Sequence, residues 1–177
     1  KNDITIFDNF SNSKEESIMY LKNLGAKIVK GDIRKIGEIN NAIKDHDIVI
    51  HLAAKISVEE SIKSPSETFQ TNVEGTKNVL IACEKNQIKK IIVASSAAVY
   101  GESEADVKLT EKSKINPISP YGESKVMMEN EIKKITENND MDYVILRFFN
   151  IYGKNQSSEY AGVITKFIKK IEMNQSL

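Results

Sequence analysis

The sequence has little cysteine and no surplus of positive or negative charge. Each shortage excludes certain kinds of site or partner. Cys83 is the single cysteine among 177 residues, which excludes an intrachain disulfide and a cysteine-rich metal site and favours a cytoplasmic protein. Lys+Arg and Asp+Glu number 25 each, so the positive excess that a nucleic-acid surface needs is missing. No apolar run approaches the length of a membrane span. We therefore expect no nucleic-acid, membrane or metal partner.

A regular alternation of short apolar runs and longer amphipathic stretches is what the sequence does contain. Runs rich in β-branched residues, typical of buried strands, cover 4–7, 26–29, 48–52, 91–94 and 143–149. Helical patterns cover 14–24, 34–45, 66–86, 119–138 and 161–173. This order predicts an α/β fold with a doubly wound parallel sheet and crossover helices. Ligands of such sheets bind at the carboxyl ends of the strands, so those ends are the candidate site.

The ends of the first three predicted strands carry polar or small residues. Asp8 can accept hydrogen bonds from both adenosine ribose hydroxyls and repel a 2′-phosphate, or form a turn that caps the next helix. Asp32 can reach an adenine amino group or cap a helix. Ala53 and Ala54 leave room for a cofactor to approach the backbone. His51 is expected to be a packed strand-end residue and not a catalyst.

The fourth strand ends at Ser95-Ser96, and Tyr121 and Lys125 follow at a spacing that places them on one helical face. A lysine ammonium near a phenol favours the phenolate and lowers its pKa from about 10, which suits a base near neutral pH. The Ser96 hydroxyl could hydrogen-bond the same substrate oxygen. A Tyr-x-x-x-Lys pair also arises by chance, so its weight comes from its place after a serine-rich strand end.

Two residues of the last predicted strand call for partners. Arg147 lies inside an apolar run, so it needs a polar neighbour. Asn150 follows the strand and could bind a ligand amide or phosphate, or form a turn. Cys83 lies on an apolar helical face and is expected to be a small core residue.

Together these segments resemble the extended short-chain dehydrogenase/reductases, in particular the NAD-dependent sugar-nucleotide epimerase/dehydratase group, with the 4-epimerases of UDP-hexoses as the most similar branch. The segments occur in the family's order and spacing across essentially the whole chain. They are Asp8-Asn9-x-x-Asn12-Ser13, Gly31-Asp32-Ile33-Arg34, His51-Leu52-Ala53-Ala54, Asn72-Val73-x-Gly75-Thr76, Ser95-Ser96-Ala97-Ala98-Val99-Tyr100-Gly101, Tyr121-Gly122-x-Ser124-Lys125 and Arg147-Phe148-Phe149-Asn150-Ile151-Tyr152-Gly153.

The resemblance implies a Rossmann-like fold, NAD as cofactor and a role for each matching residue. The adenosine ribose would be held by Asp8, Asn9, Asn12 and Ser13. Asp32 and Ile33 would contact adenine. The remaining cofactor residues would be Leu52, Ala53 and Ala54 along the pyrophosphate and nicotinamide side, Asn72 as a support, Phe148 beside the nicotinamide, and Tyr121 and Lys125.

The same resemblance assigns catalysis and substrate binding. Tyr121 would be the base, Lys125 would bind the nicotinamide ribose and tune Tyr121, and Ser96 would hydrogen-bond the sugar hydroxyl. Asn150 would contact the nucleotide-sugar diphosphate, and residues 160–164 would approach the substrate's nucleotide end. Family members commonly form homodimers through two long helices. Here these would be 66–86 and 119–138, with Met127, Met128 and Ile132 left to pack elsewhere.

Two departures from the family concern the ends. The first strand and its G-x-x-G-x-x-G turn, which binds pyrophosphate at a helix N-terminus, have no counterpart among the eight glycines. The smaller substrate domain would follow residue 177. Residues 1–177 are therefore expected to be a partial NAD-binding Rossmann domain, with the start of the substrate-binding region at about 154–177.

The residues after Ser96 bear on the reaction. Relatives that dehydrate a hexose carry an acidic pair there, whereas this chain has Ala97 and Ala98. Epimerisation needs one base and a hydride acceptor, so the full-length protein is expected to interconvert UDP-glucose and UDP-galactose through a 4-keto sugar. The alternatives are another NAD-dependent sugar-nucleotide epimerase or oxidoreductase, an inactive fragment, or a non-catalytic dinucleotide-binding module.

Overall fold

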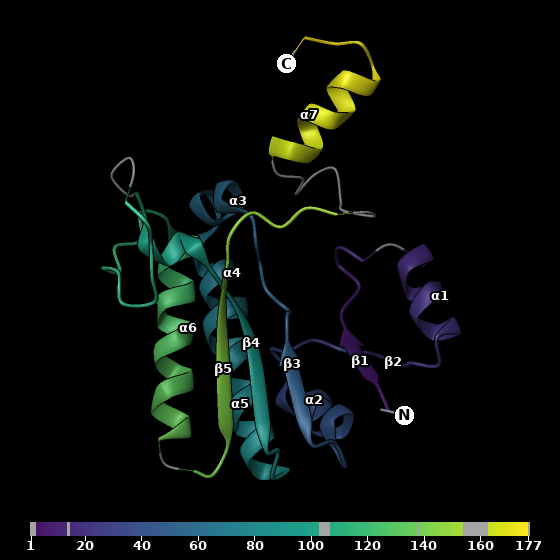
Figure 1. The fold of residues 1–177 in the computed structure, drawn as a ribbon. Coiled ribbons are helices and arrows are strands. Elements are labelled where there is room, and N and C mark those ends of the chain that lie inside the picture. Colours follow the sequence, from purple (N-terminus) through teal and green to yellow (C-terminus); the bar gives the residue numbers. More distant parts are fainter. Residues whose placement is uncertain (1–2, 14, 103–106, 138, 154–162, 177) are drawn as a thin grey trace.

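The computed structural model describes residues 3–13, 15–102, 107–137, 139–153 and 163–176 (Figure 1). Its strands are β1 (Thr5–Asp8), β2 (Lys27–Lys30), β3 (Ile48–His51), β4 (Lys90–Ser96) and β5 (Asp142–Phe148). Its longer helices are α1 (Glu15–Asn23), α2 (Ile36–Ile43), α5 (Gly75–Lys85), α6 (Pro120–Thr136) and α7 (Val163–Glu172). The predicted alternation of strands and helices is confirmed.

All the strand pairs in the described residues are parallel, but they form two separate sheets. β1 pairs with β2, and β3, β4 and β5 form a second sheet in that order. In space, β1 and β3 are the neighbouring edges of the two sheets, and no strand of the described residues lies between those edges. In a doubly wound sheet with the family's strand order, the first strand occupies that place. The expectation of a Rossmann-like sheet without that strand is therefore confirmed.

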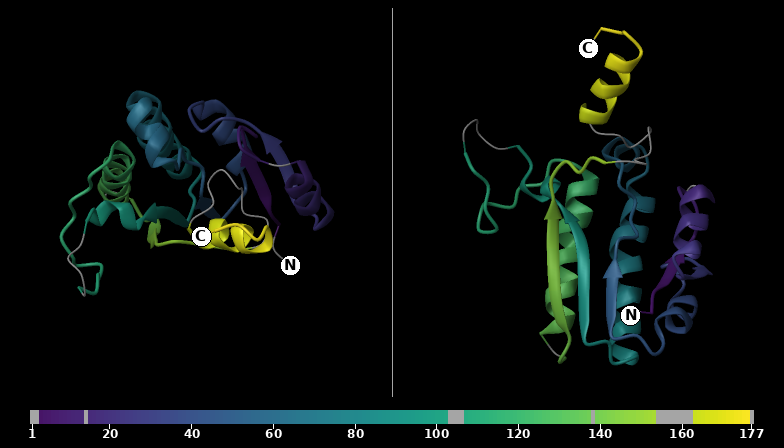
Figure 2. Two further views of the ribbon diagram at one scale, coloured as in Figure 1. Left: turned by 90° about the horizontal axis from the view of Figure 1, so that it is seen from above. Right: turned by 45° about the vertical axis from the view of Figure 1, so that its right-hand side comes forward.

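The core lies between the second sheet and the helices behind it. Helices α2, α5 and α6 cover one side of the strands, and α1 lies on the other side of the β1–β2 pair (Figure 2). Fully buried side chains come from α5, β4 and α6, and include Leu80, Cys83, Ile91, Val93, Met128 and Ile132. Cys83 is a core residue, as predicted, and its thiol is free.

The long helical pattern predicted for 66–86 is present but is not one regular α-helix. It consists of α4 (Pro65–Phe69), a π-helical turn, η1 (Gln70–Glu74), and α5. A π turn widens the helix locally, and such turns frequently mark functional sites. Here it carries Asn72, whose side chain is fully buried. The sequence patterns did not predict the short helix α3 (Val58–Lys63) that precedes it.

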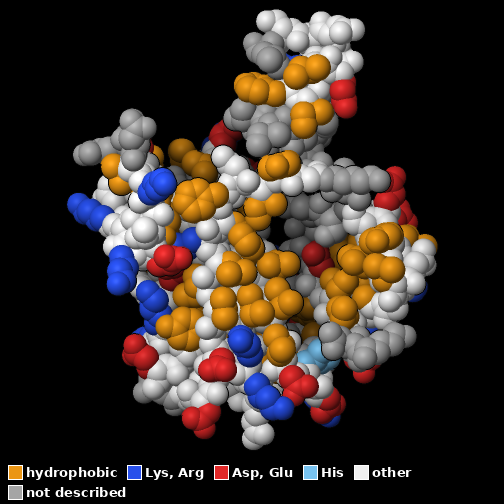
Figure 3. All heavy atoms as spheres, viewed as in Figure 1, with side chains coloured by type: hydrophobic (Ala, Val, Ile, Leu, Met, Phe, Trp, Pro, Cys, Tyr) orange, Lys and Arg blue, Asp and Glu red, His pale blue; other side chains and the backbone are white. Residues whose placement is uncertain are grey.

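The opposite face of the β3–β4–β5 sheet is apolar and uncovered in the described structure. Ile48 and Ile50 on β3 and Leu146 and Phe148 on β5 are all exposed. Figure 3 shows these strands under a continuous apolar surface. An antiparallel sheet commonly leaves one face to solvent, but parallel sheets are usually covered on both faces. This face is therefore unusually apolar for the surface of a parallel sheet.

One expectation about α6 is wrong. Met128 and Ile132 were expected to be left over for packing with another subunit, yet their exposed fractions are 1% and 0%. Both point into the core because α6 packs against the sheet and also against α5, so that two faces of the helix are buried. Only Met127 of the three is exposed, at 46%.

This burial predicts a large difference between neighbouring residues of α6. Ile132→Ala should lower the free energy of unfolding by about 2–5 kcal/mol, because it removes buried methyl groups and leaves a cavity. Met127→Ala, on the same helix, should change it by no more than about 0.5 kcal/mol. Urea unfolding monitored by circular dichroism measures both values. Equal losses for the two variants would contradict the orientation of α6 described here.

Candidate functional site

The start of α6 is fitted closely against the end of β4. Ser119 caps the helix, and its Oγ accepts a hydrogen bond from the Gly122 N–H at 3.1 Å. The Tyr121 N–H donates to the buried Ser61 Oγ on α3, also at 3.1 Å. A Cβ on Gly122 would lie 2.7 Å from the carbonyl oxygen of Ala98, so only glycine allows this approach. These contacts set the place of Tyr121.

Ser96, Tyr121 and Lys125 meet at this point, as the sequence predicted. Ser96 ends β4, and its hydroxyl accepts from the Ala98 N–H at 3.2 Å and lies near enough to the Tyr121 phenol to act on its pKa. Lys125 lies one helical turn after Tyr121 with its Nζ 5.8 Å from the centre of the phenol ring. The ammonium donates to the carbonyl oxygen of Ala94 at 2.9 Å. Their proximity is confirmed, while the catalytic role of each remains a prediction.

The electrostatics of this group differ from the expectation. Burial raises the pKa of Tyr121, and the hydrogen bond from Ser96 offsets part of that increase. Burial also lowers the pKa of Lys125 to about 8, although the negative charge of Glu129 acts in the opposite direction. The prediction that Lys125 lowers the pKa of Tyr121 below its ordinary value is therefore wrong. The ammonium lies over the ring and hydrogen-bonds to backbone, so the desolvation of the phenolate dominates.

The first predicted cofactor residues line one pocket of about 320 Å³. It lies where β1, β2 and β3 end, and therefore spans both sheets. Its walls include Asp8, Asn9, Asn12, Ser13, Asp32, Ile33, Leu52, Ala53 and Ala54. The structure thus brings together side chains from three separate segments that were predicted to contact adenosine, its ribose and the pyrophosphate.

An arginine also lies in this pocket, which the sequence analysis had not placed there. Arg34 forms a fork with Asp32, with Nε–Oδ1 at 3.0 Å and Nη2–Oδ2 at 2.6 Å. The Arg34 hydrogen bonds hold the pKa of Asp32 at about 2, so the carboxylate is charged at neutral pH. The guanidinium charge is therefore already paired. Asp8 accepts a hydrogen bond from the Phe10 N–H at 2.6 Å and keeps its place in the pocket wall.

Asn72 connects the cofactor side of the site to α6. Its amide accepts from the Lys55 N–H at 2.8 Å and donates to the Lys55 carbonyl at 2.9 Å. The same amide nitrogen donates to Ser124 Oγ on α6 at 3.0 Å. Asn72 therefore holds the segment after β3 against the helix that carries Tyr121. A role in supporting the cofactor is compatible with this position and remains a prediction.

His51 is a packed strand-end residue, as expected. Its Nε2 lies 2.9 Å from Thr76 Oγ1, and that hydroxyl donates its proton to the Asn72 carbonyl at 2.7 Å. Since a hydroxyl has one proton, Nε2–H must be the donor to Thr76, which fixes the tautomer. Burial, followed by the positive charge of Lys125, lowers the pKa of His51 to about 3. The imidazole is therefore neutral at physiological pH.

The remaining predicted residues lie at the end of β5. Phe148 is the register partner of Ser96, so it lies beside the Ser96–Tyr121–Lys125 group. Asn150 follows the strand and is exposed. Residues 160–162 of the predicted nucleotide-end segment lie outside the described residues. Arg147 has the polar partner that the sequence required, because its guanidinium binds the buried carboxylate of Glu129.

The sequence did not predict the roles of several supporting residues. Ser61 belongs to no motif, and the motifs that contain Thr76 and Ser124 did not predict the hydrogen bonds that these two residues make. Glu129 had a signal, because it follows Tyr121 and Lys125 at the same four-residue spacing and so shares their helical face. Among the described residues no cluster of His, Cys, Asp and Glu could hold a metal ion. No described helix has the length and apolar character needed to cross a bilayer.

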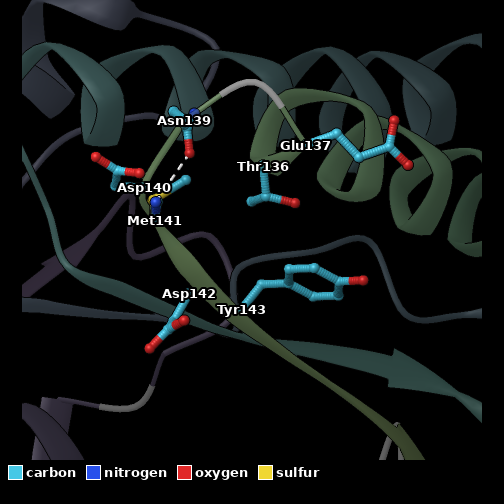
Figure 4. A pocket seen from close by; sticks show the side chains of 7 residues that line it. All are labelled: Thr136, Glu137, Asn139, Asp140, Met141, Asp142 and Tyr143. Atoms are coloured by element: carbon cyan, nitrogen blue, oxygen red, sulfur yellow. Dashed lines mark hydrogen bonds between the residues drawn. The ribbon is translucent and has the colours of Figure 1, made fainter.

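A second pocket, of about 460 Å³, lies at the opposite end of β5 (Figure 4). It follows the turn from α6 into β5, where Asn139 Oδ1 accepts from the Met141 N–H at 3.1 Å. Its walls carry the carboxylates of Glu137, Asp140 and Asp142. Because those charges repel phosphate and Ser96 lies at the other end of the sheet, this pocket is not part of the nucleotide site.

Comparison with known proteins identifies the family of the chain. The NAD dependent epimerase/dehydratase family matches the chain over residues 1–177. The chain belongs to that family. Its fold is therefore that of an NAD-dependent family, as the sequence resemblance implied.

Individual relatives agree with this placement. A protein of Methanocaldococcus jannaschii named putative UDP-glucose 4-epimerase is 40% identical over 178 residues, covering 98% of this chain and 56% of its own length. A UDP-N-acetylglucosamine 4-epimerase from Methanobrevibacter ruminantium, solved in complex with UDP-N-acetylmuramic acid, is 39% identical with a TM-score of 0.90 and covers 99% of this chain and 56% of that one.

A third relative catalyses a different reaction. A dTDP-glucose 4,6-dehydratase from Streptomyces venezuelae, solved as a double mutant with NAD bound, is 26% identical with a TM-score of 0.87, covering 99% of this chain and 54% of that one. The chain spans about half the length of the relatives it matches. The fold is thus common to epimerases and dehydratases, and the choice between them must come from the site.

The neutral His51 predicts a pH dependence of stability. Below about pH 6.5 the unfolded chain takes up a proton at this residue, whereas the folded protein does so only near pH 3. His51 therefore stabilises the fold above its unfolded pKa, and this contribution is lost as the pH falls, by up to about 1.4 kcal/mol per pH unit. Urea unfolding from pH 7 to pH 5 should show a shallower decline for His51→Gln than for the wild type. His46→Gln is the matched control and should keep the wild-type slope.

Proposed function

We propose that the full-length protein is an NAD-dependent 4-epimerase that interconverts UDP-glucose and UDP-galactose or a closely related UDP-hexose pair. The observation that carries this proposal is the meeting of Ser96, Tyr121 and Lys125 at the end of β4, with alanines at 97 and 98. The three residues supply the groups for removing a hydroxyl proton. The two alanines stand where elimination of water requires an acidic pair, which disfavours the dehydratase reaction of the third relative.

The described residues fit NAD at both ends of the cofactor. The pocket shared by the two sheets offers Asp8 to the adenosine ribose and Asp32 to adenine, with Ala53 and Ala54 leaving space for the pyrophosphate. At the other end, Lys125 would bind the nicotinamide ribose and Phe148 would lie beside the nicotinamide. When bound, NAD supplies the hydride acceptor and donor of the reaction.

The chain's own residues would handle the proton and the orientation of the sugar. The Tyr121 phenolate takes the proton of the sugar 4-hydroxyl, becoming the neutral phenol, and returns that proton after the sugar ring has presented its other face. Ser96 donates a hydrogen bond to the same sugar oxygen and keeps it next to Tyr121. Asn150 contacts the diphosphate of the substrate. The positive charge of Lys125 favours the phenolate form of Tyr121, which is the form that can accept this proton.

We further propose that the full-length protein is a homodimer. Met127 on α6 and Ile81 on α5 are exposed apolar residues on two long adjacent helices, which suits a four-helix bundle with a second copy. Met128 and Ile132 no longer support this interface, because both belong to the core. Light scattering of the full-length protein should give twice the monomer mass. A monomer at micromolar concentration would contradict this proposal.

We also propose a cytoplasmic location, because the single cysteine is a buried free thiol. Recovery of the full-length protein mainly from a secreted or periplasmic fraction would contradict it.

The proposed function predicts a clear effect of one oxygen atom. Tyr121→Phe in the full-length enzyme keeps the ring but removes the titrating hydroxyl, so turnover should fall on the order of 10²- to 10⁴-fold. Ser96→Ala should cost less, because it removes a hydrogen bond and not the base. A coupled assay of UDP-galactose formation measures both. Tyr143→Phe, at the far end of β5, is the control and should be as active as the wild type. Near wild-type turnover of Tyr121→Phe would refute its role as base.

A further inference from the structure

The last three residues of β4 each lie beside a different residue on one face of α6. The Lys125 ammonium donates to the Ala94 carbonyl, and the Ser96 hydroxyl lies near the Tyr121 phenol. Between them, Ser95 Oγ donates to Glu129 Oε1 at 2.6 Å. The helix residues are spaced by four, so the stripe at 121, 125 and 129 runs along the end of β4. Glu129 is the member of this stripe that the proposed mechanism does not use.

Glu129 is almost fully buried, with a side-chain exposure of 4%, yet its carboxylate is completely paired. In addition to the bond from Ser95, Oε1 accepts from Arg147 Nε at 2.9 Å, and Oε2 accepts from Arg147 Nη2 at 2.7 Å. Arg147 also donates to the hydroxyl of Tyr100 at 2.9 Å, and Tyr100 is the last residue of the 3₁₀ turn η2 (Ala97–Tyr100) that follows Ser96. One ion pair therefore joins α6, β4, β5 and η2 directly behind Ser96.

Stability alone does not account for this pair. A buried ion pair loses much of its hydration, and apolar residues of similar volume are often at least as stabilising in its place. The groups that face Lys125 suggest another role. They are the phenol ring of Tyr121, the carbonyl of Ala94, the neutral His51 on β3, and the negative charge of Glu129. Glu129 thus supplies the negative charge that acts on this buried ammonium.

We propose that Glu129 is a positioning residue of the catalytic site, whose carboxylate, held by Arg147 and Ser95, keeps Lys125 charged and fixes the end of β4 that carries Ser96. The proposal rests on the proposed function for the roles of Ser96, Tyr121 and Lys125. The hydrogen bonds of Glu129 are independent of it. The direction of the charge effect agrees, because burial lowers the pKa of Lys125 to about 8 and Glu129 opposes that decrease.

The proposal predicts how a neutral residue at 129 changes the pH profile. Glu129→Gln keeps the size of the side chain and can still accept from Ser95, but it removes the charge. The pKa of Lys125 should fall, so Lys125 loses its proton at lower pH and no longer stabilises the phenolate. The alkaline limb of the kcat/KM profile of the full-length, NAD-loaded enzyme should therefore move to lower pH by about one unit. Glu137→Gln, an exposed position at the end of the same helix, is the control and should leave the profile unchanged.

A structural role would give a different result. If Glu129→Gln lowers activity by the same factor at every pH, Glu129 only supports the fold and the proposal is overturned. The single variant leaves Arg147 unpaired and can fail to fold. Glu129→Gln/Arg147→Gln removes both charges and avoids that problem. Measured against Arg147→Gln, which differs from it only in the charge at position 129, a shift of its alkaline limb to lower pH supports the proposal, and coinciding alkaline limbs of the two folded variants overturn it.

A second readout separates this inference from the proposed function. Lys125 would hold the nicotinamide ribose, so NAD affinity should decrease as the pH rises and Lys125 loses its proton. In Glu129→Gln this decrease should begin at a lower pH than in the wild type. Fluorescence titration with NAD between pH 6 and pH 10 measures this without any sugar substrate. If the wild type does not interconvert UDP-hexoses, the proposed function fails while this titration still decides the role of Glu129. Identical pH dependence of NAD affinity in the two proteins overturns it.

Discussion

The packing of α6 against the end of β4 is the constraint on which the candidate site depends. Gly122 allows the first turn of the helix to approach the Ala98 carbonyl, and Ser61 and Ser119 hold that turn from two sides. Once the first turn is set, the helical period determines where Lys125 and Glu129 lie relative to β4. The geometry of the active group therefore follows from one close contact and the regular spacing of a helix.

This close packing buries the titratable groups near the end of β4, and the loss of water shifts their pKa values. It raises the pKa of Tyr121 and lowers those of Lys125 and His51. Each change favours the neutral form, as expected in a region of low dielectric constant. Charge is kept where it has a specific partner, as in the Glu129–Arg147 pair. The site thus combines groups whose pKa values are shifted by burial with one fixed pair of charges.

The sequence predicted the strands, most helices and the residues at the strand ends, because short apolar runs and helical periodicity report burial directly. It did not predict the π turn around Asn72 or the helix from Val58, since these depend on packing against α6 and not on local pattern. It placed Met128 and Ile132 outside the core because a single stripe was assumed for α6, whereas two faces are buried. The expected pKa of Tyr121 was wrong for a similar reason: spacing gives proximity but not desolvation.

The separation of the two sheets has a consequence for the pocket between them. In the described residues β1 and β2 have no backbone hydrogen bonds to β3, and they contact the rest mainly where α2 packs on α5. The 320 Å³ pocket lies across this seam, with Asp8 and Asp32 on one side and Ala53 on the other. A ligand that occupies it binds only the docked arrangement, so its concentration would set how tightly the two parts of the domain are held together.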